Sequence, residues 1–174
     1  MLILLRILFL ASAFQAQGAD RPQKGPEGSQ PAAASPEVAP ASLKVKVEGI
    51  GAYGGEIGVG LFKSKLGYPI HLEHVYEAEW TPVEAGKDSI DAVFDAIPAG
   101  DYAVSVLHDE NGNRQVDRSA VGFPKEGVGF SNEQKVTLKA PGFDKSKFSL
   151  SPGENKGIVI RLDYRHRKAP APRR

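Results

Sequence analysis

The chain has 174 residues, which is too few for two full domains once its two non-globular ends are set aside. Its 22 Lys and Arg residues nearly balance its 21 Asp and Glu residues, so no global field favours nucleic acid or an anionic membrane as a partner. Cysteine is absent, which excludes disulfides, a thiol nucleophile and a Cys-ligated zinc site.

The N-terminal residues 1–19 have the character of an export signal. Their apolar run is interrupted by Arg6 and gives way to small residues near Ala16 to Ala19. The run is too short for a membrane span but has the small-residue end of a cleavable signal peptide. An uncleaved single anchor is the alternative. We therefore expect a secreted or periplasmic protein, cleaved after Gly18 or Ala19, with no stable membrane span after signal removal.

Two low-complexity segments flank the expected folded domain at residues 43–164. Residues 20–42 contain five prolines among Ala, Gly, Gln and Ser, a composition that predicts a disordered linker. Residues 165–174 carry five Arg or Lys residues and are interpreted as a disordered basic tail. Weak adhesion of this tail to anionic lipid or polysaccharide is the alternative.

The domain itself shows short segments in which apolar and polar residues alternate, the pattern of half-buried strands. A glycine-rich turn at residues 49–55 is expected to join the first two strands in a hairpin. Loose helical spacing in residues 63–79 predicts one or two helical turns. Seven or so strands without long crossover helices predict an all-β fold, an antiparallel β-sandwich. The strands are expected at residues 43–47, 57–61, 89–95, 102–108, 135–139, 147–150 and 158–164.

Most polar side chains with a potential for chemistry lie between Ala99 and Asn132, where a strand runs into the oxygen-rich sequence HDENGN. The register of this loop is that of a calcium site, with the Gln115 carbonyl at position 7. However, Arg114 replaces the usual glycine and Ala120 the usual bidentate glutamate. The alternative is a structural turn, in which Asn111-Gly112 suits a type I′ hairpin and Asp and Asn side chains bind their own backbone. The candidate Ca²⁺ ligands are Asp109, Asn111, Asn113 and Asp117.

The histidines allow two further interpretations. His108 ends a strand, where it is expected to donate to a loop carbonyl at the rim; a ligand or a general base is the alternative. His71 and His74 have the spacing of two zinc ligands on one helix face, although exposed histidines are the commoner outcome. No nucleophile elbow, P-loop or dinucleotide motif appears, and Gly127-x-Gly129 is interpreted as a flexible loop. The chain is therefore not expected to be an enzyme.

The block GDYAVSVLHDENGN, followed by VDRSAVGFPKEGVGFSN and PGFDKSKFSL, resembles the bacterial secreted family known as domain of unknown function 2141 (DUF2141). The resemblance covers residues 43–164 and implies an exported sandwich of the immunoglobulin-like or transthyretin-like kind, without an established activity. The chain departs from the family pattern at Arg114 and Gln115, where Gly-Lys is usual. The matching positions are Gly100, Tyr102, Ala103, His108, Asp109, Asn111, Gly112, Asn113, Asp117, Gly122, Pro124, Glu126, Gly127, Gly129, Phe130, Ser131 and Asn132.

Together these observations predict a non-catalytic exported module that binds a partner protein, a glycan or an envelope component through the loop end of the sandwich. A Ca²⁺-stabilised module is the first alternative, and a hydrolase using His108 with Asp109 or Glu126 is the second. The corner formed by the HDENGN sequence (residues 108–113) and the glycine loop (residues 122–132) are expected to touch. Asp109, Asn113 and Asp117 would then accept N–H groups or a cation from the glycine loop.

Overall fold

The computed structural model describes residues 39–51, 54–135 and 139–164. The predicted signal peptide, most of the predicted linker and the basic tail lie outside the described residues. So does the centre of the strand expected at residues 135–139. Within the described ranges, no helix has the length and apolar character that a membrane crossing requires.

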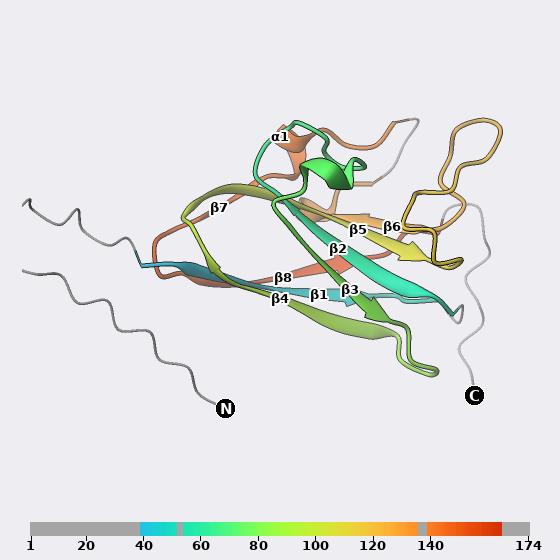
Figure 1. The fold of residues 1–174 in the computed structure, drawn as a ribbon, viewed down its shortest axis with the longest axis horizontal. Helices are drawn as coiled ribbons and strands as arrows, with labels where there is room; N and C mark the ends of the chain where they lie inside the picture. The colour runs from blue at the N-terminus through green and yellow to red at the C-terminus, as the bar shows by residue number, and fades with distance from the viewer. Residues whose placement is uncertain (1–38, 52–53, 136–138, 165–174) are drawn as a thin grey trace, which may run out of the picture. The chain divides into compact units, whose positions relative to one another are not determined.

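Strands dominate the described part of the chain, which contains eight of them and three short helices (Figure 1). The strands are β1 (Ala41–Glu48), β2 (Glu56–Phe62), β3 (Glu77–Pro82), β4 (Ser89–Ile97), β5 (Gly100–Asp109), β6 (Gly127–Phe130), β7 (Phe148–Leu150) and β8 (Asn155–Arg161). The helices are the 3-10 turns η1 (Leu72–His74) and η2 (Ser131–Glu133) and the single α-helical turn α1 (Phe143–Ser146).

Two sheets pack against each other, which confirms the all-β, sandwich-like prediction. One sheet has the strand order β4-β1-β8, and the other has the order β3-β2-β5-β6, with β7 paired to the start of β5. Their apolar faces meet in one core, with Leu43, Val45 and Val47 on β1 opposite the alternating apolar residues of β2 and β5. Each such buried aliphatic side chain contributes about 1.5–3 kcal/mol through the hydrophobic effect.

The expected hairpin of the first two strands is wrong. β1 pairs with β4 and β8 in one sheet, while β2 pairs with β3 and β5 in the other. Each strand has one apolar face, and crossing to the opposite sheet lets the two faces cover each other across the core. One strand pair departs from the predicted antiparallel arrangement, because β1 and β8 run parallel. β8 follows β7 of the other sheet, so no tight turn constrains its direction relative to β1.

The glycine segment expected to be a flexible loop is strand β6, paired to β5 with Gly127 opposite His108. Its glycines face the inner side, where a Cβ on Gly129 would lie 2.6 Å from Ile160 Cγ2 and one on Gly127 would collide with the ring of Tyr164. Val128 and Phe130 point to the outer side. Alternation of glycine with apolar residues is therefore a strand pattern here, with close backbone approach on one face.

Residues 63–79 contain one helical turn, within the prediction of one or two, and also the start of a strand that was not expected. Only η1 is helical, and β3 begins at Glu77. The sequence of β3, EAEWTP, carries few apolar residues because this strand lies at the edge of its sheet, so the alternation that reveals buried strands is weak there.

Candidate functional site

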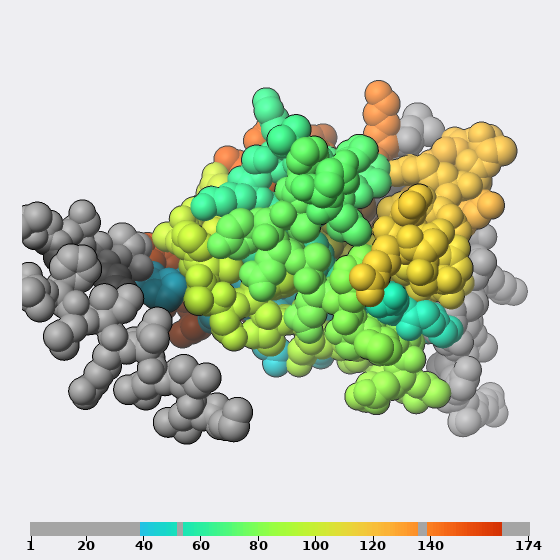
Figure 2. Space-filling model, viewed as in Figure 1, coloured from blue at the N-terminus to red at the C-terminus, as the bar shows by residue number. Residues whose placement is uncertain are grey.

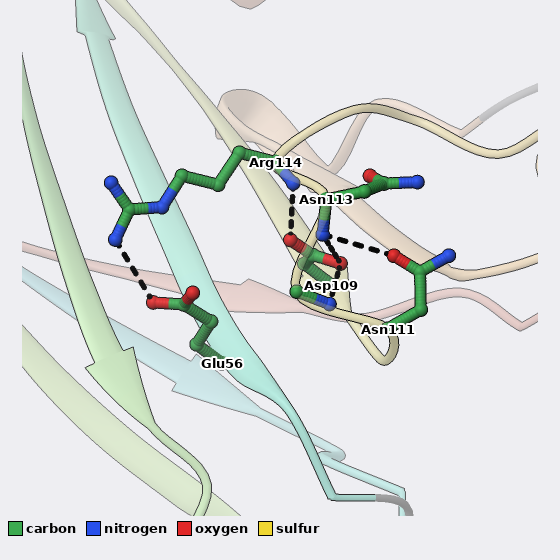
Figure 3. Close-up of polar contacts among 6 residues, drawn as sticks. Glu56, Asp109, Asn111, Asn113 and Arg114 are labelled. Carbon is green, nitrogen blue, oxygen red and sulfur yellow. Dashed lines mark hydrogen bonds and ion pairs between the residues drawn. The ribbon is translucent and has the colours of Figure 1, made fainter.

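The carboxylate of Asp109, at the end of β5, organises the polar corner of the sandwich. Asp109 is completely buried. Its Oδ1 accepts hydrogen bonds from the backbone N–H groups of Gly112 (2.8 Å) and Asn113 (3.2 Å), and its Oδ2 accepts one from Arg114 (2.6 Å). Figure 3 shows the loop wrapped around this carboxylate. A buried charge is tolerated when it is bonded in this way, and three N–H groups supply that compensation.

This wrapping overturns the type I′ turn expected at Asn111-Gly112. Such a turn requires positive φ at both residues, whereas positive φ occurs at Gly112 (74°) and Arg114 (55°) and not at Asn111. Binding three consecutive N–H groups to one carboxylate requires a wider loop than a two-residue hairpin. Arg114, which stands where the calcium register has glycine, adopts the left-handed conformation itself at a cost of about 1–3 kcal/mol.

The other three tentative calcium ligands bind one another and the loop backbone. Asp117 accepts hydrogen bonds from the side-chain amides of Asn111 (2.8 Å) and Asn113 (3.2 Å). The amide oxygens of Asn111 and Asn113 accept the N–H groups of Asn113 (3.0 Å) and Gln115 (2.7 Å). These are the contacts of the structural turn, and the calcium site stays a prediction. In the part of the chain that the structure describes, His, Cys, Asp and Glu side chains form no group of three or more suited to a metal ion.

Glu126 connects the glycine loop to this corner, so the expected contact between the two motifs is present. It is 4% exposed, and its two carboxylate oxygens accept the N–H groups of Glu110 (3.1 Å) and Asp117 (3.0 Å). Glu126 of the glycine loop is therefore an acceptor, while the expected direction is also present, because the backbone carbonyl of Asp117 accepts the N–H of Lys125 (2.8 Å). Burial raises the pKa of Glu126, the two N–H groups oppose that effect, and the nearby charges of Asp117 and Asp109 add to it.

His108 is a buried structural residue. Its Nε2 lies 3.0 Å from the carbonyl oxygen of Gly54, and its Nδ1 lies 2.6 Å from the hydroxyl of Tyr164. A carbonyl only accepts, so Nε2 carries the proton and Nδ1 accepts from Tyr164, which in turn accepts the N–H of Gly51 (3.0 Å). The expected donation to a loop carbonyl is present, but His108 is fully buried and not at a rim.

The end of the glycine loop anchors β6 to its neighbours. The hydroxyl of Ser131 accepts the N–H of Val104 (2.9 Å) and donates to the carbonyl of Ser146 (2.7 Å). The side chain of Asn132 donates to the carbonyl of Lys147 (2.8 Å). These contacts give Ser131 and Asn132 a structural role, which holds the edge strand against β5 and α1. Gly122 (φ 89°) and Pro124 lie beyond the corner, in the loop before β6.

The outer face of the five-stranded sheet carries a cleft that was not predicted from the sequence. The volume open to the centre of a water molecule is about 50 Å³, so the cleft is shallow and opens to solvent. Residues around η1, green in Figure 2, lie on one side and the yellow loop after β5 on the other. It is lined by Gly58, Val59, Gly60, Pro69, Ile70, Leu72, Ala78, Trp80, Ser105, Val106, Leu107, Arg114, Val116, Arg118, Gly122, Phe123, Pro124, Val128, Phe130 and Ala140.

Two glycines, Gly58 and Gly60, alternate along the outward side of β2 beneath the cleft, and neighbouring side chains approach the backbone closely at both positions. The ring of Trp80 lies directly over Gly58, where an added Cβ would be 2.5 Å from ring carbons. The guanidinium of Arg114 lies over the same ring, 5.0 Å from the ring centroid. Figure 3 shows the contact of this guanidinium with Glu56, in which Arg114 Nη2 is 3.5 Å from Glu56 Oε2. The alternate glycines Gly58 and Gly60 were the sequence signal for such a close approach.

Comparison with known proteins gives one match. A model of the family described as "Uncharacterized protein conserved in bacteria (DUF2141)" matches residues 45–158. No curated protein matches the chain. No solved structure matches it either, so the closer assignment to immunoglobulin-like or transthyretin-like sandwiches stays a prediction.

Proposed function

We propose that this chain, which belongs to the uncharacterised bacterial DUF2141 family, is an exported, non-catalytic module that binds a ligand in the cleft on its five-stranded sheet. The observation that carries the proposal is the cleft itself. Its lining is mainly apolar and includes the aromatic ring of Trp80 and a few polar side chains, which is the usual composition of a binding site. The loop after β5 forms one wall, so the binding site includes the loop end of the sandwich.

The positions of the residues considered for catalysis support a binding role. His108 and Asp109 are completely buried, and their side chains bind protein groups on the core side of β5 and within the loop. A general base must reach the proton it removes from a substrate, and neither residue lines the cleft. Export is supported by the apolar N-terminal run with its small-residue end.

Energy transfer from Trp80 to a neutral dye tests binding in the cleft, because Trp80 is the only tryptophan of the chain. Nile red should quench Trp80 emission saturably in the wild type. Gly60→Val adds its side chain beneath the cleft, where its Cβ would lie 3.1 Å from the Phe62 ring and 3.4 Å from Val75 Cγ2, and the resulting shift of these side chains into the cleft should abolish the quenching. Gly157→Val on β8 is the matched control, since a Cβ there meets nothing within 4 Å. Both variants are first shown to be folded by circular dichroism.

Two results would contradict cleft binding: no saturable quenching in the wild type, or equal quenching in the folded Gly60→Val variant. Export is tested separately by fractionating bacteria that express the full chain and by measuring the mass of the recovered protein. We expect the exported protein to begin at Ala19 or Asp20. A cytoplasmic protein that retains Met1 would contradict export.

A further inference from the structure

We infer, on the basis of the proposed binding function, that the ligand of the cleft is a slim amphipathic anion, an apolar chain or ring that carries a carboxylate bound by Arg114. The inference uses the charge of the cleft in addition to its shape. It goes beyond the proposed function because a cleft of this form could equally hold a neutral or a cationic molecule.

The apolar part of the ligand follows from the walls and floor. Ile70 and Leu72 line one side, and Phe123 and Pro124 line the other. Ile70 is 39% exposed, so an apolar ligand that covered it would remove its surface from water. The ring of Trp80 covers Gly58, and Phe62 and Val75 approach Gly60, so the open part of the cleft is small and suits a narrow body better than a branched one.

The charged residues that line the cleft indicate that the ligand carries an anionic group. Arg114 and Arg118 line the cleft, and none of the lining residues is acidic. Opposite charge on the ligand is therefore the complement of this surface. A guanidinium pairs with a carboxylate through two parallel N–H donors, which makes carboxylate the natural partner for a single, well-placed arginine.

Arg114 is positioned for this role by the polar corner. Its N–H group is bound by Asp109 at 2.6 Å, and its left-handed backbone directs the side chain across the sheet to Trp80. The side chain remains 58% exposed, and the 3.5 Å contact with Glu56 is long for an ion pair. A strained residue that presents a reachable cation above an aromatic ring is a feature of binding sites rather than of cores.

Three ten-carbon probes that differ only in charge test the inference: decanoate, decanol and decylamine, each used below its aggregation concentration at neutral pH. Trp80 emission reports binding of each. Decanoate should bind saturably, decanol about ten-fold more weakly because it lacks the charged pair, and decylamine more weakly still. Arg114→Gln keeps the Asp109 contact through the backbone and should weaken decanoate about ten-fold while leaving decanol unchanged. Arg161→Gln, an exposed arginine of the other sheet, is the control and should change nothing.

Equal or tighter binding of decanol or decylamine would overturn the anionic ligand, and so would unchanged decanoate affinity in Arg114→Gln. In both cases Nile red quenching could persist, so cleft binding would stand while this inference fails. A concentration-dependent dimer that Gly60→Val abolishes in sedimentation would assign the cleft to a second copy of the chain and would also overturn the inference.

Discussion

Tyr164 donates a short hydrogen bond to His108, with 2.6 Å between the hydroxyl oxygen and Nδ1. The two rings meet edge to face, with centroids 5.9 Å apart and planes at 84°. This contact joins the end of the described domain to the end of β5. Since His108 also donates to the Gly54 carbonyl, the pair closes one end of the sandwich.

Replacing Tyr164 with phenylalanine tests this closure. The change leaves Nδ1 of His108 without its donor and the N–H of Gly51 without its acceptor, both in a partly buried position. The free energy of unfolding, measured in urea, should fall by about 1–3 kcal/mol. Tyr76→Phe is the control, because Tyr76 is 42% exposed, and should change stability little. Equal stability of the two variants would contradict a structural role for the pair.

The residues of this pair show what the sequence could and could not provide. His108 follows the alternation of β5, so its inward direction was predictable from Tyr102, Val104 and Val106. Its partner was not, because Tyr164 is 56 residues away and local periodicity carries no information on which segments meet. The same limit explains the wrong hairpin: alternation gave β1 and β2 their apolar faces but not the sheets to which they belong.

Asp109 should be the most sensitive polar residue of the corner. Asp109→Asn replaces one carboxylate oxygen by an NH₂ group that faces backbone N–H donors and removes the charge from the remaining bonds. The free energy of unfolding should fall by about 2–3 kcal/mol, since bonds to charged groups are worth about 1.5–3 kcal/mol each. Asp95→Asn, an exposed aspartate on β4, should be nearly neutral. A loss below about 0.5 kcal/mol for Asp109→Asn would show that the carboxylate does not hold the loop.

Thermal unfolding with and without a chelator separates the structural turn from the predicted Ca²⁺ site. Asp117 and the two asparagines already satisfy one another and the loop backbone. We therefore expect the same Tm in excess chelator and in millimolar Ca²⁺. A Tm that rises with Ca²⁺ concentration would show binding to the folded state and would favour the calcium alternative.

That corner was only half predictable. The run of Asp and Asn residues predicted a loop rich in hydrogen bonds from backbone N–H groups to side chains. Which donor binds which acceptor depends on three-dimensional positions and could not be predicted. Glu126 illustrates this point: it lies 16 residues beyond Glu110 and yet binds its N–H. The cleft was hidden for a related reason, since its two walls are separate in sequence and only the glycines of β2 hinted at it.

Glu126 should make stability fall as the pH rises through its pKa. Burial raises this pKa above the value of 4.5 that an unperturbed glutamate has, so the folded state holds the proton more tightly than the unfolded chain. The stabilising contribution of Glu126 is complete when the pH lies below the pKa that it has in the unfolded chain. It is lost as the pH rises through the higher pKa that it has in the folded state. Glu126→Gln does not titrate, so the advantage of the wild type over this variant should shrink as pH rises. Urea unfolding at a series of pH values measures it.

The control for this pH series is Glu133→Gln, because Glu133 is an exposed glutamate close to the same loop. The Glu133→Gln series is the baseline with which the Glu126→Gln series is compared. If the advantage of the wild type over Glu126→Gln grew with pH, the folded-state pKa of Glu126 would be depressed and not raised. That result would assign a larger effect to the two N–H groups than to burial.

Gly129→Ala tests the close approach of β6 to β8. The added Cβ would lie 2.6 Å from Ile160 Cγ2 and 3.2 Å from the carbonyl oxygen of Arg161, so one strand must move. Overpacking of this kind should lower the free energy of unfolding by about 1–3 kcal/mol. Gly157→Ala on β8, with open space around its Cβ, should be neutral or slightly stabilising. The double variant Gly129→Ala/Ile160→Ala should lose less stability than the sum of the losses of the two single variants. The reason is that removing Ile160 Cγ2 vacates the space that the new methyl group needs. Fully additive losses would mean that the two residues do not touch.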